Sequence, residues 1–179
     1  MTSIIKNAAT LGITYKATAS DIYQSHYPSN VFTDSTSSRY ESTNTVNSWW
    51  QISFSKSVSI SSYIIKGIPD STLRPKNWII EAYLDSNIWE TVDTQTGIDT
   101  GINRNPFVLK QTVKCKYFRI VSKGNWGGWN DLQFYFFDCF GSIAKPKTKK
   151  VICSRYVSYF KYKIFVSIYT SSYSSFLLS

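Results

Sequence analysis

The sequence predicts an all-β protein whose strands form an antiparallel sandwich or jelly roll. Apolar and polar residues alternate at period two in several short runs, which is typical of half-buried strands, and Ser, Gly, Asn and Pro separate these runs. Before residue 142, no segment repeats apolar residues at helical spacing. Because parallel strands need helical crossovers, the sheet is expected to be mainly antiparallel.

The strands are expected to follow one another through turn-rich connections. In the first strand, Trp50, Ile52 and Phe54 share one face. Residues 85–87 form a polar turn between two alternating runs, which predicts a hairpin, and residues 94–106 are expected to form a loop. The predicted strands, at least seven in number once neighbouring runs join, are residues 49–54, 58–60, 62–66, 78–84, 88–92, 107–113, 117–121 and 132–137.

This pattern predicts one folded domain with two flanking segments, since 179 residues fit a single core. Residues 1–14 are expected to be a lead-in and residues 15–143 the jelly-roll domain. Residues 144–179 are expected to be a basic, Tyr- and Ser-rich tail outside the core. The alternative is an arm that touches an anionic surface or nucleic acid, because its basic residues are interleaved with aromatic ones.

The net charge of +9 comes mostly from the tail. Residues 142–179 hold seven basic residues and no acid, whereas residues 1–141 hold 13 basic and 11 acidic residues. The domain itself is therefore not expected to bind nucleic acid.

The cellular location of the protein is predicted from the absence of recognisable targeting and membrane-spanning segments. No early run resembles a signal peptide, and the longest apolar-leaning run, residues 164–179, is shorter than the ~20 residues of a membrane span. Three cysteines, Cys115, Cys139 and Cys153, cannot all pair with one another. A cytoplasmic chain without a transmembrane segment is the resulting prediction.

Enzymatic activity has little support in the sequence. His26 is the single histidine, so nucleophilic catalysis would depend on it, and no G-x-S-x-G motif is present. The carboxylates are scattered, and the glycines at 124–128 do not form a nucleotide-binding motif. A binding function is therefore favoured.

Loop residues are the candidate ligand contacts. Trp126 and Trp129 lie in a Gly- and Asn-rich loop, where an exposed indole can stack on a sugar ring, although packing that closes the barrel end is the alternative. An arginine in a polar loop could hold a carboxylate, and a loop histidine could bind a hydroxyl or a carbonyl, but plain solvent exposure is the more common role of such residues. By contrast, Trp49, Trp50, Trp78 and Trp89 lie in alternating strands and are expected to be core residues. The candidate ligand-binding residues are His26, Tyr27, Arg39, Arg74, Trp126 and Trp129.

Several short motifs follow one another in a characteristic order. They are Ala17-Thr18-Ala19-Ser20, residues 27–34, Trp49-Trp50-Gln51-Ile52-Ser53-Phe54, residues 76–89 with the pattern K-x-W-x-I-E-x-x-x-D-x-x-x-W, Tyr117-Phe118-Arg119-Ile120, Asn125-Trp126-Gly127-Gly128 and Asp138-Cys139-Phe140-Gly141. Over about residues 15–143, this order resembles the coagulation factor 5/8 type C, or discoidin, domain of the galactose-binding-like superfamily.

The resemblance implies an eight-stranded jelly-roll β-sandwich without catalytic activity, which binds a carbohydrate or protein ligand through loops at one end. A structural or adaptor domain without a small-ligand site is the alternative. The chain looks most like the disulfide-free versions in intracellular proteins of single-celled eukaryotes, because no cysteine precedes Cys115. The resemblance also implies a structural Ca²⁺ held by Asp34 and Asp138, although Ser35 stands where the family usually has Gly.

Overall fold

The computed structural model describes residues 2–84, 88–103 and 105–143, and the tail predicted at 144–179 lies outside the described residues. All regular elements in the described part are strands or short 3₁₀ helices, which confirms the all-β fold class. None of the helices described there is long and apolar enough to cross a membrane. The elements are β1 (Tyr15–Ala19), η1 (Pro28–Phe32), β2 (Tyr40–Glu41), β3 (Trp49–Lys66), η2 (Ser71–Leu73), β4 (Trp78–Tyr83), β5 (Trp89–Gln95), β6 (Phe107–Ser122), β7 (Gln133–Phe134) and β8 (Phe136–Ile143).

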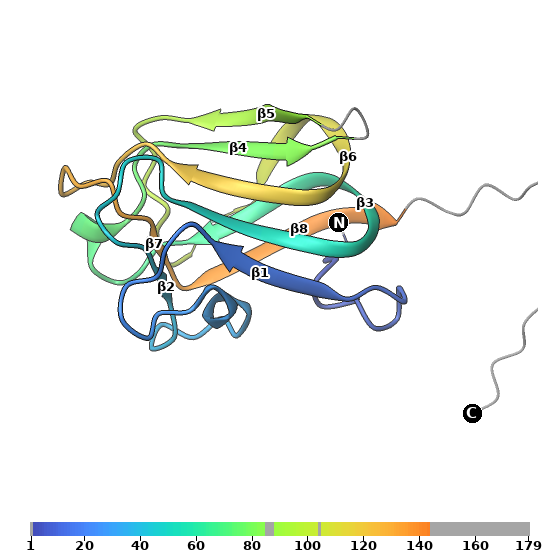
Figure 1. Cartoon of the computed structure of the whole chain (residues 1–179), viewed down its shortest axis with the longest axis horizontal. Coiled ribbons are helices and arrows are strands. Elements are labelled where there is room, and N and C mark those ends of the chain that lie inside the picture. Colours follow the sequence, from blue (N-terminus) through green and yellow to red (C-terminus); the bar gives the residue numbers. More distant parts are fainter. Residues whose placement is uncertain (1, 85–87, 104, 144–179) are drawn as a thin grey trace, which may run out of the picture. The chain divides into compact units, whose positions relative to one another are not determined.

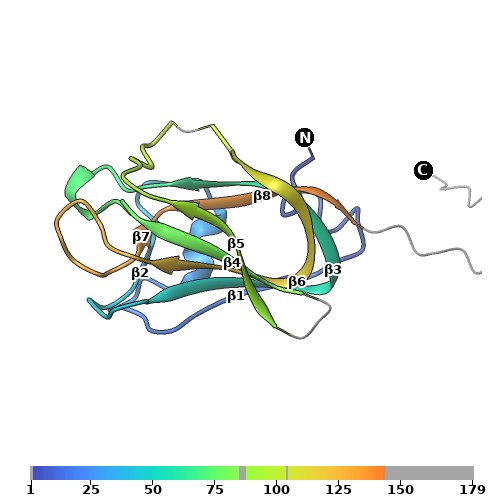
Figure 2. The same ribbon diagram turned by 90° about the horizontal axis from the view of Figure 1, so that it is seen from above.

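The two long strands, β3 and β6, connect both halves of the antiparallel sandwich (Figure 1). The first part of β3 pairs with β1 and with the second part of β6, where Trp50 lies opposite Ile120. Its second part pairs with β8 and with the first part of β6, where Ile60 lies opposite Val113. β4 and β5 extend the sheet beyond β6, as Figure 2 shows from above, and β2 pairs with β7.

Residues 49–66 form one bent strand and not the three strands predicted from the sequence. The register of β3 against β6 shifts between Ser53 and Val58, where Ser55 and Lys56 are exposed. These polar residues interrupt the apolar alternation, but the backbone stays extended through the bend. The predicted strands at 107–113 and 117–121 are likewise one strand, β6.

Large aromatic side chains fill the core between the layers. Trp50 and Trp78 are fully buried, as predicted. Each indole N–H finds an acceptor, since Trp50 Nε1 donates to the Pro28 carbonyl at 2.9 Å and Trp78 Nε1 donates to the Tyr63 hydroxyl at 3.1 Å. These hydrogen bonds allow both indoles to be buried without an unpaired donor.

Trp49 and Trp89 are only half-buried, so the prediction that both are core residues is wrong. Their rings lie near the guanidinium of Arg119, whose Cζ is 3.9 Å from the centroid of Trp89 and 6.0 Å from that of Trp49. Arg119 also pairs with Glu81 on the neighbouring strand. The two tryptophans therefore stabilise a charged pair outside the core.

Residues 2–14 belong to the packed domain and are more than the lead-in that the sequence suggests. Ile4, Ile5 and Ala8 are buried in the core. Backbone hydrogen bonds attach the segment to β8, because the Ile4 N–H donates to the Cys139 carbonyl at 2.9 Å. The segment consists mostly of turns, so it shows no period-two pattern in the sequence.

Candidate ligand-binding site

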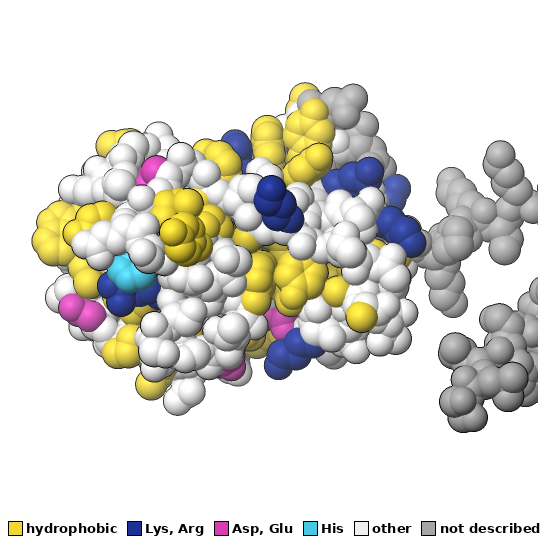
Figure 3. Space-filling view, turned by 60° about the horizontal axis from the view of Figure 1, so that its bottom comes forward, with side chains coloured by type: hydrophobic (Ala, Val, Ile, Leu, Met, Phe, Trp, Pro, Cys, Tyr) yellow, Lys and Arg dark blue, Asp and Glu magenta, His cyan; other side chains and the backbone are white. Residues whose placement is uncertain are grey.

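Two pockets open among the loops at the end of the sandwich where β2 and β7 lie. The first, called the Trp129 pocket here, has a volume of about 270 Å³. Figure 3 shows the single histidine at the surface of this end, beside basic and hydrophobic side chains. The Trp129 pocket is lined by Tyr23, Glu41, Ser42, Thr43, Asn44, Leu73, Trp129, Asp131 and Gln133.

Buried polar side chains form one wall of the Trp129 pocket. Asp131 is 6% exposed and accepts hydrogen bonds from Asn125 Nδ2 at 2.7 Å and from Gln133 Nε2 at 2.5 Å. Gln133 is 2% exposed, and its Oε1 has no hydrogen-bond partner among the described residues. A buried acceptor without a donor is costly, and the side chain that carries this oxygen lines the pocket.

Burial governs the ionisation of Asp131. It raises the pKa of this carboxyl, and the nearby charge of Glu41 raises it further, whereas hydrogen bonds from Gln133 and Asn125 act in the opposite direction. The net shift is upward. The hydrogen bonds that Asp131 accepts therefore offset only part of the cost of burying its charge.

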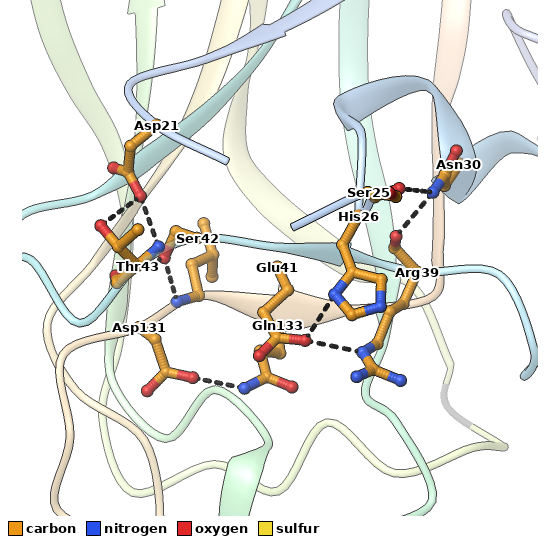
Figure 4. A network of polar contacts seen from close by, with 11 residues as sticks. Asp21, Ser25, His26, Asn30, Arg39, Glu41, Ser42, Thr43, Asp131 and Gln133 are labelled. Carbon is orange, nitrogen blue, oxygen red and sulfur yellow. Dashed lines mark hydrogen bonds and ion pairs between the residues drawn. The ribbon is translucent and has the colours of Figure 1, made fainter. Parts of the chain in front are cut away.

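A second carboxylate of the pocket lies beside two basic side chains. Glu41 Oε2 lies 2.8 Å from His26 Nδ1 and 2.9 Å from Arg39 Nε. Figure 4 shows His26 and Arg39 directed at Glu41 on β2. Arg39 Nε donates a hydrogen bond to this oxygen and holds the carboxylate, whereas His26 Nδ1 lies close to it without forming a hydrogen bond.

Asp21 fixes the rim of the pocket. Its Oδ1 accepts hydrogen bonds from the backbone N–H of Thr43 at 2.5 Å and from Thr43 Oγ1 at 2.8 Å. Its Oδ2 accepts from Ser20 Oγ at 2.6 Å and from Ser48 Oγ at 3.1 Å. Burial alone would raise the pKa of Asp21, but these hydrogen bonds outweigh it and lower the pKa. An ionised Asp21 therefore holds the loop that carries Thr43 and Asn44.

The loop at 123–130 presents its two tryptophans at the surface, where Trp129 is 50% exposed and Trp126 is 43% exposed. Asn125 closes this loop, because its Oδ1 accepts from the Trp129 N–H and its own N–H donates to the Trp129 carbonyl, both at 2.9 Å. Gly127 N–H also donates to the Thr72 carbonyl at 2.6 Å. The loop is thus held by backbone contacts and by Asn125, and both indoles remain partly exposed.

Trp126 belongs to a second pocket, the Trp126 pocket, with a volume of about 320 Å³. It is lined by Ser71, Thr72, Asp99 and Trp126. A larger cleft of about 460 Å³ lies between β5 and β6, but its lining residues include no aromatic side chain. The two tryptophan pockets therefore combine an aromatic surface with polar groups in a way that the larger cleft does not.

Of the predicted ligand residues, Trp129 lines the Trp129 pocket, whereas His26 and Arg39 are not lining residues and reach it only through their contacts with Glu41. Trp126 lies in the second pocket, next to Arg74, whose Nη1 binds both oxygens of Asp99 at 3.1 and 3.2 Å. Tyr27 is 53% exposed and precedes η1, away from the lining of both pockets.

The sequence analysis missed Tyr23, Asp131 and Gln133. For the last two, a signal was available: they flank Leu132 in a run whose other members are apolar, and such alternation can place polar side chains beside a core.

Asp34 and Asp138 do not fit a shared calcium site. Both carboxylate oxygens of Asp34 bind Lys66 Nζ at 2.8 Å, so an ammonium group already occupies the position of a cation. Asp138 is buried and accepts from Ser3 Oγ at 2.9 Å and from the Cys139 N–H at 2.8 Å. Among the described residues, no group of three or more His, Cys, Asp or Glu side chains could hold a metal. The geometry therefore does not support the Ca²⁺ that the resemblance implies.

Solved structures with the same fold include carbohydrate-binding modules. A family 32 module from C. perfringens NanJ, in complex with galactose, is 11% identical, with a TM-score of 0.63 over 77% of this chain and 97% of the module. CpGH89CBM32-5 from Clostridium perfringens, in complex with GalNAc-β-1,3-galactose, is 10% identical, with a TM-score of 0.64 over 78% of this chain and 100% of its own. Chitosan-binding module 1 from a chitosanase/glucanase of Paenibacillus sp. IK-5 is 20% identical, with a TM-score of 0.61 over 73% of this chain and 98% of its own.

These likenesses establish the galactose-binding-like β-sandwich fold, and a family model establishes the family. No curated protein matches the chain. The model of the F5/8 type C domain matches residues 16–135, which is more than half of the chain and includes β1 through β7. With the strand order and the loop pockets in place, the match leads to one conclusion: the chain belongs to the F5/8 type C domain family.

Proposed function

We propose that this domain is a non-catalytic carbohydrate-binding module whose Trp129 pocket holds a neutral, hydroxyl-rich sugar. One observation carries the proposal: a half-exposed indole and a buried, unpaired amide oxygen line the same pocket, from Trp129 and Gln133. The indole offers an apolar face for the C–H side of a sugar ring. The amide oxygen offers an acceptor for a hydroxyl at its edge.

The charges of the pocket favour a neutral sugar over an acidic one. Asp131 and Glu41 both line the pocket. Both can accept hydrogen bonds from hydroxyl groups, and an ionised Asp131 would repel the carboxylate of a uronic acid. Arg39 compensates Glu41 through the contact at 2.9 Å, so its charge is not available for an anionic sugar.

The solved structures of the same fold support a carbohydrate as the ligand, whatever its charge. Two of them were determined with a bound galactose or GalNAc-β-1,3-galactose, and a third is named as chitosan-binding. A protein ligand remains the competing outcome of the experiment below.

A cytoplasmic location also belongs to this proposal. Its support is that Cys139 is a buried free thiol, as is common where the surroundings are reducing. Fractionation of cells that produce the tagged chain would test it, and recovery of the chain outside the cytoplasm would contradict it.

A glycan array followed by calorimetry tests the binding function. We expect the chain to bind a neutral glycan and Trp129→Ala to weaken that binding at least tenfold, equivalent to about 1.4 kcal/mol, without a change in melting temperature. Tyr27→Ala is the matched control, because Tyr27 is an equally exposed aromatic residue outside the pocket, and it should leave the affinity unchanged. The absence of glycan binding alongside capture of a protein partner, or full affinity in Trp129→Ala, would refute the proposal.

A further inference from the structure

The Trp126 pocket lies directly beside the Trp129 pocket. The short helix η2 contributes to both, since Leu73 lines the Trp129 pocket and Ser71 and Thr72 line the Trp126 pocket. The loop at 123–130 also contributes to both, with one tryptophan in each. The two exposed indoles therefore belong to one loop, and η2 lies beside both pockets.

Two exposed glycines connect the tryptophans on the loop that contributes to both pockets. Gly127 and Gly128 lie between the two tryptophans in the sequence and are exposed. The Gly127 N–H holds the Thr72 carbonyl at 2.6 Å, and a Cβ atom on Gly127 would lie only 3.2 Å from that carbonyl oxygen. Gly128 has a φ of +82°, which favours glycine. The close packing on η2 thus requires a bare backbone where a ligand would cross.

The groups around Trp126 suit a second sugar unit. Hydroxyls of Ser71 and Thr72 and the carboxylate of Asp99 line the pocket beside the indole. Lys76 Nζ lies 4.6 Å from the centroid of the Trp126 ring, which places a hydrogen-bond donor near the pocket. Arg74 pairs with Asp99, and this pair fixes the carboxylate. The Trp126 pocket thus repeats the combination of an indole and polar groups found in the Trp129 pocket.

We infer that the two pockets are adjacent subsites for one oligosaccharide of at least two sugar units. The Trp129 pocket holds one unit, the chain crosses the bare backbone of Gly127 and Gly128, and the Trp126 pocket holds a following unit. This inference rests on the proposed function, because it assumes that the Trp129 pocket binds a sugar. It adds that the preferred ligand is a chain and not a single sugar, since each further contact adds to the binding free energy.

Calorimetry with a series of chain lengths tests the inference. The full-length protein is titrated with the mono-, di-, tri- and tetrasaccharide of the best glycan on the array. We expect the affinity to rise at least tenfold from the monosaccharide to an oligomer in the wild-type protein. Trp126→Ala should keep the affinity for the monosaccharide within twofold but lose this rise, whereas Trp126→Phe, which retains an aromatic face, should keep most of it. Trp129→Ala should lose binding at every length.

A second variant blocks the Trp126 pocket without altering the loop at 123–130, so its effect on binding cannot come from a change in the loop. Ser71→Phe places a bulky ring in the Trp126 pocket from the exposed surface of η2 without changing either tryptophan. We expect it to abolish the gain with chain length as Trp126→Ala does. Melting curves of all variants should coincide with that of the wild-type protein.

Three results would overturn the inference. An affinity that does not rise with chain length would show that only one sugar is bound. An undiminished rise in both Trp126→Ala and Ser71→Phe would show that the longer ligand takes another path. Loss of monosaccharide binding in Trp126→Ala would show that both tryptophans serve one site. None of these results contradicts sugar binding at the Trp129 pocket, which fails if no glycan binds while a protein partner is captured, or if Trp129→Ala binds normally.

Discussion

Asn125 is the side chain on which the geometry of the binding loop depends most. It is 3% exposed and makes two side-chain hydrogen bonds, one to the carboxylate of Asp131 and one from the backbone N–H of Trp129. Asn125→Ala removes both and leaves a buried carboxylate short of a donor. A neutral buried hydrogen bond contributes about 1 kcal/mol and one to a charged group about 1.5 to 3 kcal/mol, so we expect a loss of roughly 2 to 4 kcal/mol.

Urea denaturation followed by tryptophan fluorescence measures this loss. Asn130→Ala is the matched control, since it removes an amide from the same loop whose backbone N–H, and not its side chain, bonds to Asn44. The control should stay within about 0.5 kcal/mol of the wild-type stability. Asn125→Ala should also weaken sugar binding, because the Trp129 indole loses its fixed position. A variant as stable as the control, with full affinity for sugar, would refute the role given to Asn125.

Three further predictions concern the fold. Burial raises the pKa of Asp138 above its usual value of 3.8, so the wild-type protein should lose stability as the pH rises from 3.8 through the raised pKa. In Asp138→Asn, Oδ1 can keep both hydrogen bonds without a buried charge, so the variant should lose less stability over the same pH range. An equal loss of unfolding free energy in the wild-type protein and the variant, measured by urea denaturation at a series of pH values, would contradict this. Ile4→Ala should destabilise the protein by about 2 to 5 kcal/mol in the same assay, because Ile4 is fully buried, and an unchanged midpoint would remove residues 2–14 from the core. Dithiothreitol should leave the melting temperature unchanged, since Cys139 is a buried free thiol, and a shift of several degrees would show a disulfide.

The fold could be predicted from the sequence wherever one face of a strand is buried. Trp50, Ile52 and Phe54 alternate with more exposed residues in β3 as the sequence indicates. β1 was not identified by this pattern, because its residues are mostly half-buried on both faces. The two residues of β2 are too few to show any period. Apolar periodicity therefore predicts a strand only where its two faces differ in burial, and a strand whose faces are similarly buried is not detected.

The candidate site could be predicted only in part. Trp129 and His26 stand out because of residue type, as an indole in a glycine-rich loop and a lone histidine. Gln133 stands out only as a polar residue in an apolar run, since the unpaired oxygen that makes it important is revealed by the folded chain alone. The separation of Trp126 from Trp129 into two pockets also depends on the position of η2, which is distant in sequence from the loop.

Chemical-shift mapping by NMR tests the central claim most directly. The ¹⁵N-labelled chain is titrated with the neutral glycan selected on the array, and the indole and amide signals are followed together. We predict that the indole N–H of Trp129 and the side-chain amide of Gln133 shift in a saturable manner, whereas the buried indole of Trp78 does not. Saturable shifts confined to residues outside the Trp129 pocket, with Trp129 and Gln133 unchanged, would contradict the account.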